Sequence, residues 1–449
     1  MKSINPATNE LIKEYTEYTP AEVENIIQSV DSDWQSWKRT TFAERAKLMR
    51  NAADILLKER DECAEIITAE MGKVIKESRM EVEKCALGCN YYAENTERII
   101  QDEIVETSYS KSFISYHPIG IVLAVMPWNF PFWQVFRYIA PGIMAGNAGV
   151  LKHASNVMGC AVKIEEIMKK AGFPENLFRS LLISSGQVQA VIENPLVKAV
   201  TLTGSEPAGS KVAATAGKDL KKTVLELGGS DPFVVLEDAD LEKAAQTAAV
   251  SRNLNCGQVC IAAKRFIIVE SVAEKFQELQ KKATEALIVG DPMDEATQVA
   301  PMSRPDLVDE LHVQVEKSVE MGAELVVGGN KLDRPGNYYA PTILGNVKKG
   351  MPAYDEETFG PVAANIIVKD EEEAIKVAND TPFGLGASVW TQDVERGERV
   401  AREIESGMVF VNNMTASMPN MPFGGAKRSG YGRELSDFGV KEFLNIKTI

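Results

Sequence analysis

The chain has 449 residues, of which 64 are acidic and 49 basic, so its net charge is −15. This length allows two or three domains with large cores, and the negative charge disfavours nucleic acid and anionic membranes as partners. No run approaches 18 consecutive apolar residues, so no membrane span is expected. The N-terminal residues lack the apolar core of a signal peptide, and we expect a cytoplasmic protein.

The first hundred residues have a helical pattern. Apolar residues recur at alternating steps of four and three over 42–56, which predicts one buried helix face. Thr41 and Glu44 form a capping-box pattern at its start. Short β-branched runs and helical patterns then alternate, which is typical of parallel sheets covered by helices. Strands are expected at 119–125, 197–202, 233–236, 266–269 and 325–327, and helices at 157–171, 240–252 and 272–287.

Two such α/β units fit the length, and the last sixteen residues, 434–449, form either an edge strand of a subunit contact or a frayed tail. The six cysteines are too sparse for a disulfide framework. Four of them, in helical patterns, are expected to be ordinary core or surface residues. The three histidines are far apart, so neither a zinc site nor a Ser-His-Asp triad is expected.

Three polar residues are candidates for chemistry. Cys260 follows a short glycine-containing break and is either a nucleophile or a buried free thiol. Glu226 precedes two glycines and is either a general base or a solvated carboxylate. Asn129 lies between two prolines after an apolar strand, where α/β proteins bind ligands, and its amide is either an oxyanion donor or part of a turn.

The segment 204–209 follows a strand and opens a helix with small residues, which would expose backbone N–H groups to a phosphate. It matches neither the Gly-x-Gly-x-x-Gly fingerprint nor a Walker A loop. Taken alone it is a weak signal.

Seven ordered motifs together resemble the aldehyde dehydrogenase superfamily. They are Pro127-Trp128-Asn129, Lys152, Gly204-Ser205, Glu226-Leu227-Gly228-Gly229, Gly257-Gln258-Val259-Cys260, Glu357-Thr358-Phe359-Gly360-Pro361 and Pro422-Phe423-Gly424-Gly425. The match runs from residue 5 to the C-terminus. Glu226 and Cys260 are 34 residues apart, as that family's base and nucleophile are.

The resemblance implies an α/β fold with a Rossmann-like cofactor domain (1–98 and 118–227), an α/β catalytic domain (228–425) and a small β arm for oligomerisation (99–117 and 434–449). It implies that Cys260 attacks an aldehyde to form a thiohemiacetal, that Asn129 and the Cys260 N–H stabilise the oxyanion, and that Glu226 activates water to hydrolyse the later thioester. It also implies a dimer or tetramer built by sheet extension.

The resemblance further implies a nicotinamide cofactor, NADP or NAD. Its contacts would be Trp128, Lys152, Ser155, Gly204, Ser205, Glu357 and Phe359. NAD-selective relatives often carry glutamate where this chain has Ser155. Because a serine does not repel a 2′-phosphate and can donate a hydrogen bond to it, we expect NADP to be accepted.

The closest resemblance is to short bacterial succinate-semialdehyde dehydrogenases. It implies that Arg137, Trp133 and Ser417 contact the substrate, since a guanidinium fork suits a carboxylate. Some relatives place a second arginine where this chain has Leu254. The segment 418–421 replaces a more polar pattern with two methionines, which we expect to widen the pocket for less polar aldehydes.

Three alternatives remain beside this enzyme: a broad-specificity aldehyde dehydrogenase, a coenzyme-A-acylating one, against which Glu226 argues, and a non-catalytic binding protein on the same fold. Cys256 lies four residues before Cys260. It either forms a reversible disulfide with Cys260 or is a small neighbour whose side chain points elsewhere.

Overall fold

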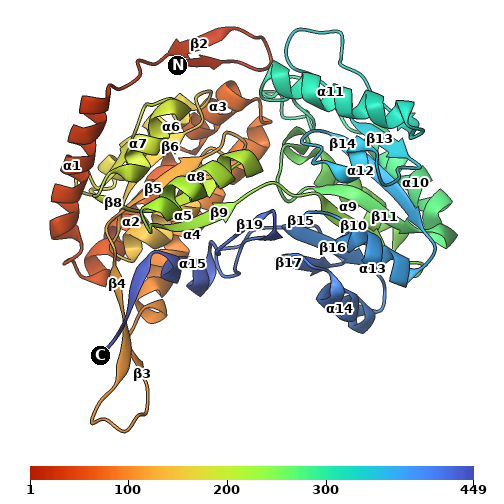
Figure 1. Ribbon diagram of the computed structural model, residues 1–449. Coiled ribbons are helices and arrows are strands. Elements are labelled where there is room, and N and C mark those ends of the chain that lie inside the picture. Colours follow the sequence, from red (N-terminus) through yellow and green to blue (C-terminus); the bar gives the residue numbers. More distant parts are fainter.

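The computed structural model describes residues 1–449, which form two α/β lobes side by side and a projecting arm (Figure 1). A six-stranded sheet, in the order β19-β9-β8-β5-β6-β7, organises the first lobe. All its pairs are parallel except β19 with β9. The strands are β5 (Ile121–Met126), β6 (Ala148–His153), β7 (Phe178–Ser180), β8 (Val197–Thr203), β9 (Lys222–Glu226) and β19 (Gly430–Tyr431).

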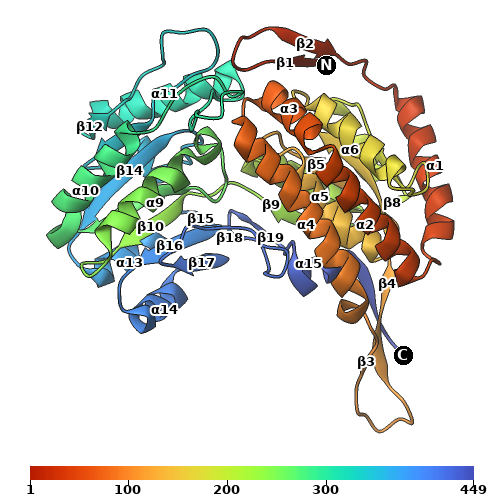
Figure 2. The same ribbon diagram turned by 180° about the vertical axis from the view of Figure 1, so that it is seen from behind.

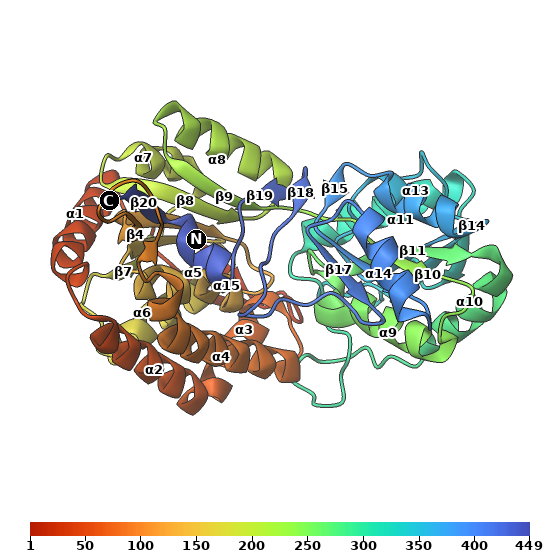
Figure 3. The same ribbon diagram turned by 90° about the horizontal axis from the view of Figure 1, so that it is seen from below.

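Helices cover both faces of this sheet, with α2 and α4 on one face and α7 and α8 on the other (Figures 2 and 3). The capping boxes at Thr19 and Thr41 satisfy the first free N–H groups of α1 and α2. The helices are α1 (Pro20–Trp37), α2 (Phe42–Lys58), α3 (Arg60–Met71), α4 (Ile75–Ile99), α5 (Trp133–Met144), α6 (Met158–Lys170), α7 (Val188–Glu193) and α8 (Glu206–Lys218), with a 3₁₀ turn η1 (Ser185–Gln187) and the hairpin β1 (Lys2–Ile4) and β2 (Leu11–Glu14).

A seven-stranded sheet, in the order β12-β13-β14-β11-β10-β16-β17, forms the second lobe. Only its edge strand β12 is antiparallel to its neighbour. The strands are β10 (Asp231–Val235), β11 (Ala263–Val269), β12 (Glu324–Val327), β13 (Thr342–Gly345), β14 (Val362–Val368), β16 (Gly386–Trp390) and β17 (Met408–Val411). The helices are α9 (Leu241–Asn253), α10 (Glu270–Glu285), α11 (Pro305–Glu320), α12 (Pro352–Asp355), α13 (Glu371–Asn379) and α14 (Val394–Glu403), with a 3₁₀ turn η2 (Leu254–Gly257).

The arm is a three-stranded antiparallel sheet in the order β20-β4-β3, and its hairpin projects away from both lobes (Figure 1). It combines β3 (Glu103–Ile104) and β4 (Phe113–Pro118) with the C-terminal strand β20 (Leu444–Thr448), which follows α15 (Ser436–Glu442). Two short strands, β15 (Phe383–Gly384) and β18 (Ala426–Lys427), pair beside the second lobe. Strand β20 thus has a free edge, because β4 occupies only one side.

The predicted α/β alternation is confirmed, and each predicted strand and helix overlaps an observed one within a few residues. Cys63, Cys85, Cys89 and Cys160 are buried in α3, α4 and α6, as expected of core residues. No helix has the length and hydropathy needed to cross a membrane. Since β5, β6, β8 and β9 run parallel, their carboxyl ends share one edge, and several candidate residues lie there.

Candidate active site

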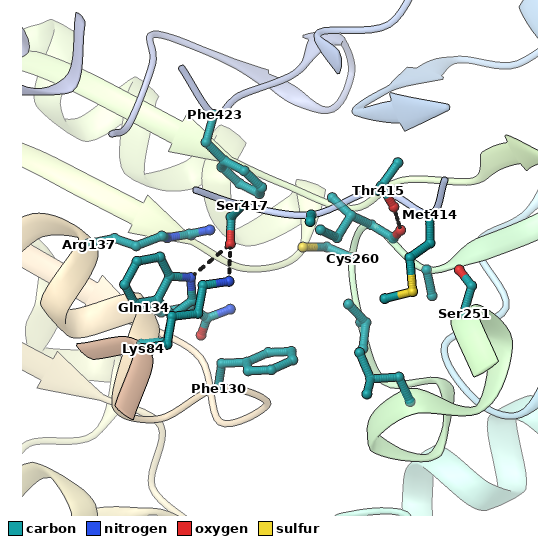
Figure 4. Close-up of a pocket in the computed structure, with 16 residues that line it drawn as sticks. Lys84, Phe130, Gln134, Arg137, Ser251, Cys260, Met414, Thr415, Ser417 and Phe423 are labelled. Atoms are coloured by element: carbon teal, nitrogen blue, oxygen red, sulfur yellow. Dashed lines mark hydrogen bonds between the residues drawn. The ribbon is translucent and has the colours of Figure 1, made fainter. Parts of the chain in front are cut away.

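A cavity of about 130 Å³ lies where the two lobes meet (Figure 4). Its walls come from α4, from the start of α5, from the loop before β11 and from the loop before β18. The residues that line it are Lys84, Phe130, Trp133, Gln134, Arg137, Ser251, Leu254, Val259, Cys260, Ile261, Ala262, Met414, Thr415, Ala416, Ser417 and Phe423. Cys260 is the only thiol among them.

The loop that carries Cys260 has an unusual backbone. Asn255, Cys256 and Gly257 all have left-handed φ angles of 50°, 53° and 72°. Left-handed non-glycine residues cost on the order of 1–3 kcal/mol each, so surrounding contacts must hold them. The Arg252 guanidinium donates to the Gly257 carbonyl at 2.5 Å, and the Glu77 carboxylate accepts from the Asn255 N–H at 2.9 Å. The loop is therefore fixed from two helices.

The electrostatics of Cys260 are set by burial and by two cations. Burial raises the pKa of the thiol to about 11, while Arg137 and Lys264 oppose that rise. The Lys264 ammonium also donates to the Cys260 carbonyl at 2.7 Å and lies 3.3 Å from the Glu357 carboxylate. A thiol in this setting is protonated at rest and needs a base or a further cation to become the reactive thiolate.

Asn129 lies against the Cys260 loop, as expected. Its side-chain amide donates to the Gln258 carbonyl at 2.9 Å, and its own oxygen accepts from Gln134 at 2.9 Å. An amide nitrogen has two donors, so one N–H of Asn129 stays free. The backbone N–H of Cys260 has no acceptor within the protein either. Two donors, one from each of two adjoining loops, thus remain without a protein acceptor near the sulfur.

Glu226 is the last residue of β9 and does not line the cavity. Its side chain is buried, and neither carboxylate oxygen has a hydrogen-bond partner. Burial, followed by the nearby negative charge of Glu434, raises its pKa well above the usual range, while Arg137 and Arg433 oppose the rise. No hydrogen bond therefore holds this carboxyl in its present position.

One end of the cavity is polar and cationic. Trp133 and Arg137 are four residues apart in α5 and therefore share one helix face. The indole N–H of Trp133 donates to the Ser417 hydroxyl oxygen at 3.0 Å. Arg137 is held by the Glu434 carboxylate at 2.7 Å, by the Thr203 hydroxyl at 3.1 Å and over the Phe423 ring. These three predicted substrate residues are thus brought together with Cys260 (Figure 4).

The structure adds Lys84, which the sequence did not single out. Its ammonium donates to the Ser417 hydroxyl oxygen at 2.7 Å and lies 4.6 Å from the centre of the Trp133 ring. Lys84 belongs to an inward-facing polar stripe of α4. Glu77 in this stripe holds the Cys260 loop, and Glu81 accepts from the first N–H groups of α5 at 2.8 and 3.0 Å. Nothing in the charged sequence of this helix separates these three from its surface residues.

One expectation about the site is wrong. Met418 and Met421 are 40% and 53% exposed and do not line the cavity, because the chain there turns outward after Ser417. The methionine that faces the cavity is Met414. Cys256 does not face Cys260: it is buried in the core of the second lobe, whereas Cys260 lines the cavity and packs against the first lobe. Of the two alternatives stated for Cys256, the structure therefore has the small neighbour that points away from Cys260.

The predicted cofactor residues lie near the carboxyl edge of the first sheet. Lys152 is the penultimate residue of β6, Ser155 is exposed two residues beyond that strand, and Ser205 is the N-cap residue of α8 but makes no side-chain capping bond. Lys152 is buried, and burial alone lowers its pKa, so no carboxylate of the protein pairs with it. An unpaired buried ammonium on the sheet edge at which α8 also begins suits an anionic, hydroxyl-bearing ligand.

Glu357 and Phe359 complete this side. The Glu357 carboxylate accepts from the Gly229 N–H at 3.0 Å and lies so close to Gly228 that a Cβ there would displace it. The Phe359 ring packs edge-to-face against Trp128 with 5.9 Å between ring centres. These residues together fit a dinucleotide that carries ribose hydroxyls and phosphates.

Comparison with known proteins agrees with this geometry. The model of the aldehyde dehydrogenase family matches residues 1–449, and the chain belongs to that family. It is 51% identical over 447 residues to a probable succinate-semialdehyde dehydrogenase [NADP(+)] of Synechocystis sp., covering 100% of this chain and 98% of that protein. It is 47% identical over 450 residues to succinate-semialdehyde dehydrogenase [NADP(+)] 1 of Mycobacterium tuberculosis, covering 100% and 98%.

A solved structure shares the fold closely. The succinic semialdehyde dehydrogenase of Streptococcus pyogenes, in complex with NADP+, superposes with a TM-score of 0.98 at 40% identity and covers 100% of this chain and 99% of that one. The predicted family and fold are therefore confirmed.

Proposed function

We propose that this protein oxidises succinate semialdehyde to succinate with NADP as the hydride acceptor. The observation that carries the proposal is one cavity with the Cys260 thiol at its centre and the Arg137 guanidinium at its polar end. A thiol suits attack on an aldehyde carbon, and a guanidinium suits the carboxylate at the other end of the molecule. The names of the relatives point to the same substrate and cofactor.

The first chemical step is assigned to Cys260. Its thiolate would attack the aldehyde carbon, so that a C–S bond forms and the carbonyl π pair moves to oxygen. The free N–H of Asn129 and the backbone N–H of Cys260 would donate to that oxyanion. A correctly aimed oxyanion donor contributes about 3–4 kcal/mol.

Glu226 is assigned the hydrolytic step. The chemistry that a bound nicotinamide supplies is acceptance of a hydride from the adduct, which leaves a thioester on Cys260. The Glu226 carboxylate would rotate toward this thioester and take a proton from water. As the water oxygen bonds to the thioester carbon, the C–S bond would break and release the carboxylate product and the Cys260 thiolate. Because no hydrogen bond holds the Glu226 side chain, this rotation breaks none.

Lys152, Glu357, Gly204 and Ser205 would hold the dinucleotide, with Trp128 and Phe359 beside the nicotinamide. Ser155 is the proposed basis of NADP use, since it brings a hydroxyl and no negative charge close to Lys152. Steady-state kcat/KM with both cofactors tests this. A ratio for NAD over NADP above about ten would overturn the assignment.

A broad-specificity aldehyde dehydrogenase is the second candidate, because much of the cavity wall is apolar, including Phe130, Leu254, Val259 and Met414. A panel of aldehydes separates the two. Succinate semialdehyde should have a kcat/KM at least about tenfold above that of butanal, which has the same carbon chain without the charge. Equal values would favour the broad enzyme.

We further assign residues 1–98 and 118–227 to cofactor binding, 228–425 to catalysis, and 99–117 with 434–449 to oligomerisation. The free edges of β20 and β17 suit sheet extension between two copies, as dimer or tetramer. Light scattering after Ile446→Pro, which removes a donor from β20, should show loss of the oligomer. Six free cysteines, five of them buried, fit the reducing cytoplasm.

A further inference from the structure

Lys84 is a cation of the cavity with no carboxylate of its own. Its ammonium has one hydrogen bond, to the Ser417 hydroxyl, and no ion pair. The side chain is half-buried against the Trp133 ring. Arg137, the other cation of this wall, is instead paired with Glu434 at 2.7 Å. Lys84 is therefore the cavity cation whose charge the protein leaves uncompensated.

The hydroxyl of Ser417 is fixed in one role by its neighbours. The Lys84 ammonium and the Trp133 indole are both donors only, and both point at the Ser417 oxygen, at 2.7 and 3.0 Å. They use the two lone pairs of that oxygen, so the O–H of Ser417 must donate to a third group. No acceptor for it exists within the protein, and the cavity is the side left open (Figure 4). Ser417 thus presents a donor.

An ammonium and an obligatory O–H donor on one wall select a ligand with acceptor oxygens and negative charge. Leu254 lines the same cavity from η2 and offers no charge. Lys84 approaches the same cavity from a different helix.

We propose that Lys84, acting with Ser417, is a second cation beside Arg137 that recognises the substrate carboxylate. This inference rests on the proposed function. It makes Lys84 a specificity-determining residue that binds the substrate end remote from Cys260 and takes no part in the bond changes. It also predicts rejection of aldehydes that carry a cationic group.

The test compares Lys84→Met, Lys84→Arg and wild type with NADP, using succinate semialdehyde and butanal. Lys84→Met keeps the length of the side chain and removes its charge. Its kcat/KM with succinate semialdehyde should fall about 10- to 100-fold, mostly through KM, because a hydrogen bond to a charged group is lost. With butanal it should change by less than about threefold. Lys84→Arg should retain most of the preference. Lys47→Met, an exposed lysine of α2, is the matched control and should behave as wild type.

Each other outcome of these measurements would overturn either the inference about Lys84 or the proposed function. An equal loss with both aldehydes would mean that Lys84 only supports the fold, and unchanged kinetics with succinate semialdehyde would mean that it does not meet the carboxylate; either result overturns the inference. Lys84→Arg behaving like Lys84→Met would show that charge is not the determinant and would overturn it as well. If wild type itself does not prefer succinate semialdehyde, the proposed function has failed, which is a separate result.

Discussion

Replacing Glu226 by glutamine should separate the two halves of the proposed reaction. Glutamine has the shape of glutamate but cannot accept a proton at neutral pH, so Cys260 should still be acylated while hydrolysis stalls. Because Glu226 does not line the cavity and its oxygens have no partner, the change should leave the walls around Cys260 intact. A positioned general base contributes about 10²- to 10⁴-fold, and the steady-state rate of Glu226→Gln should fall by that amount.

The assay is a stopped-flow record of NADPH with saturating succinate semialdehyde. Glu226→Gln should produce a burst of about one NADPH per active site, followed by the slow steady state that marks accumulation of an acyl-enzyme. In the native enzyme the hydrolytic rate should rise with pH, because only the deprotonated carboxylate acts and burial raises its pKa. Below that pKa the rate should fall about tenfold per pH unit.

Glu434→Gln is the matched control. The substitution removes the negative charge of Glu434, which raises the pKa of Glu226. It also frees Arg137 from its ion pair, and the positive charge of Arg137 lowers the pKa of Glu226, so both effects lower that pKa. The pH profile of hydrolysis should therefore move to lower pH. A steady-state rate of Glu226→Gln equal to that of the native enzyme, or slowed turnover without a burst, would refute the assignment of Glu226 as the hydrolytic base.

Three further changes have defined outcomes. Ser155→Glu should lower kcat/KM for NADP at least about tenfold and leave NAD less affected, since a carboxylate repels the 2′-phosphate; a parallel loss with both cofactors would contradict this. Gly257→Ala should nearly abolish activity and lower the melting temperature by circular dichroism, because its φ is +72° and a Cβ would overlap the Gly360 carbonyl. The KM for succinate semialdehyde should rise above pH 8, because Lys84 then loses its proton. Burial, followed by the positive charge of Arg137, lowers the pKa of Lys84 to about 8; its other charged or titratable neighbours are Cys85, Glu81 and Lys73. A KM that stays constant between about pH 7 and 9 would contradict this.

Many residues of the candidate site could be predicted from the order of strands and motifs along the chain. Asn129 and Glu226 lie at the carboxyl ends of β5 and β9, and residues at the ends of parallel strands converge at one edge. Cys260 instead precedes β11 of the second sheet, and the glycine-containing break before it was its local signal. The capping box at Thr41 and the helix after it depend only on local sequence, so they could be predicted from spacing.

The sequence did not indicate correctly which side chains point into the cavity. Met418 and Met421 lie close in sequence to Ser417, yet the chain turns outward there, and no local pattern indicates that turn. Lys84 was missed for the complementary reason. It is one of many charged residues in α4, and only packing against α5 shows that its side faces the cavity.

The inward stripe of α4 has a practical consequence for changing the specificity of this enzyme. Three residues of the single helix α4 contact the site: Glu77 accepts from the Cys260 loop, Glu81 accepts from the N-terminus of α5, and Lys84 lines the cavity. If only the cavity loops were exchanged with those of a homologue, the residues that α4 contributes to the cavity would stay unchanged. A graft that carries the whole of α4 with those loops should retain both turnover and selectivity, whereas loop exchange alone should yield a mismatched hybrid.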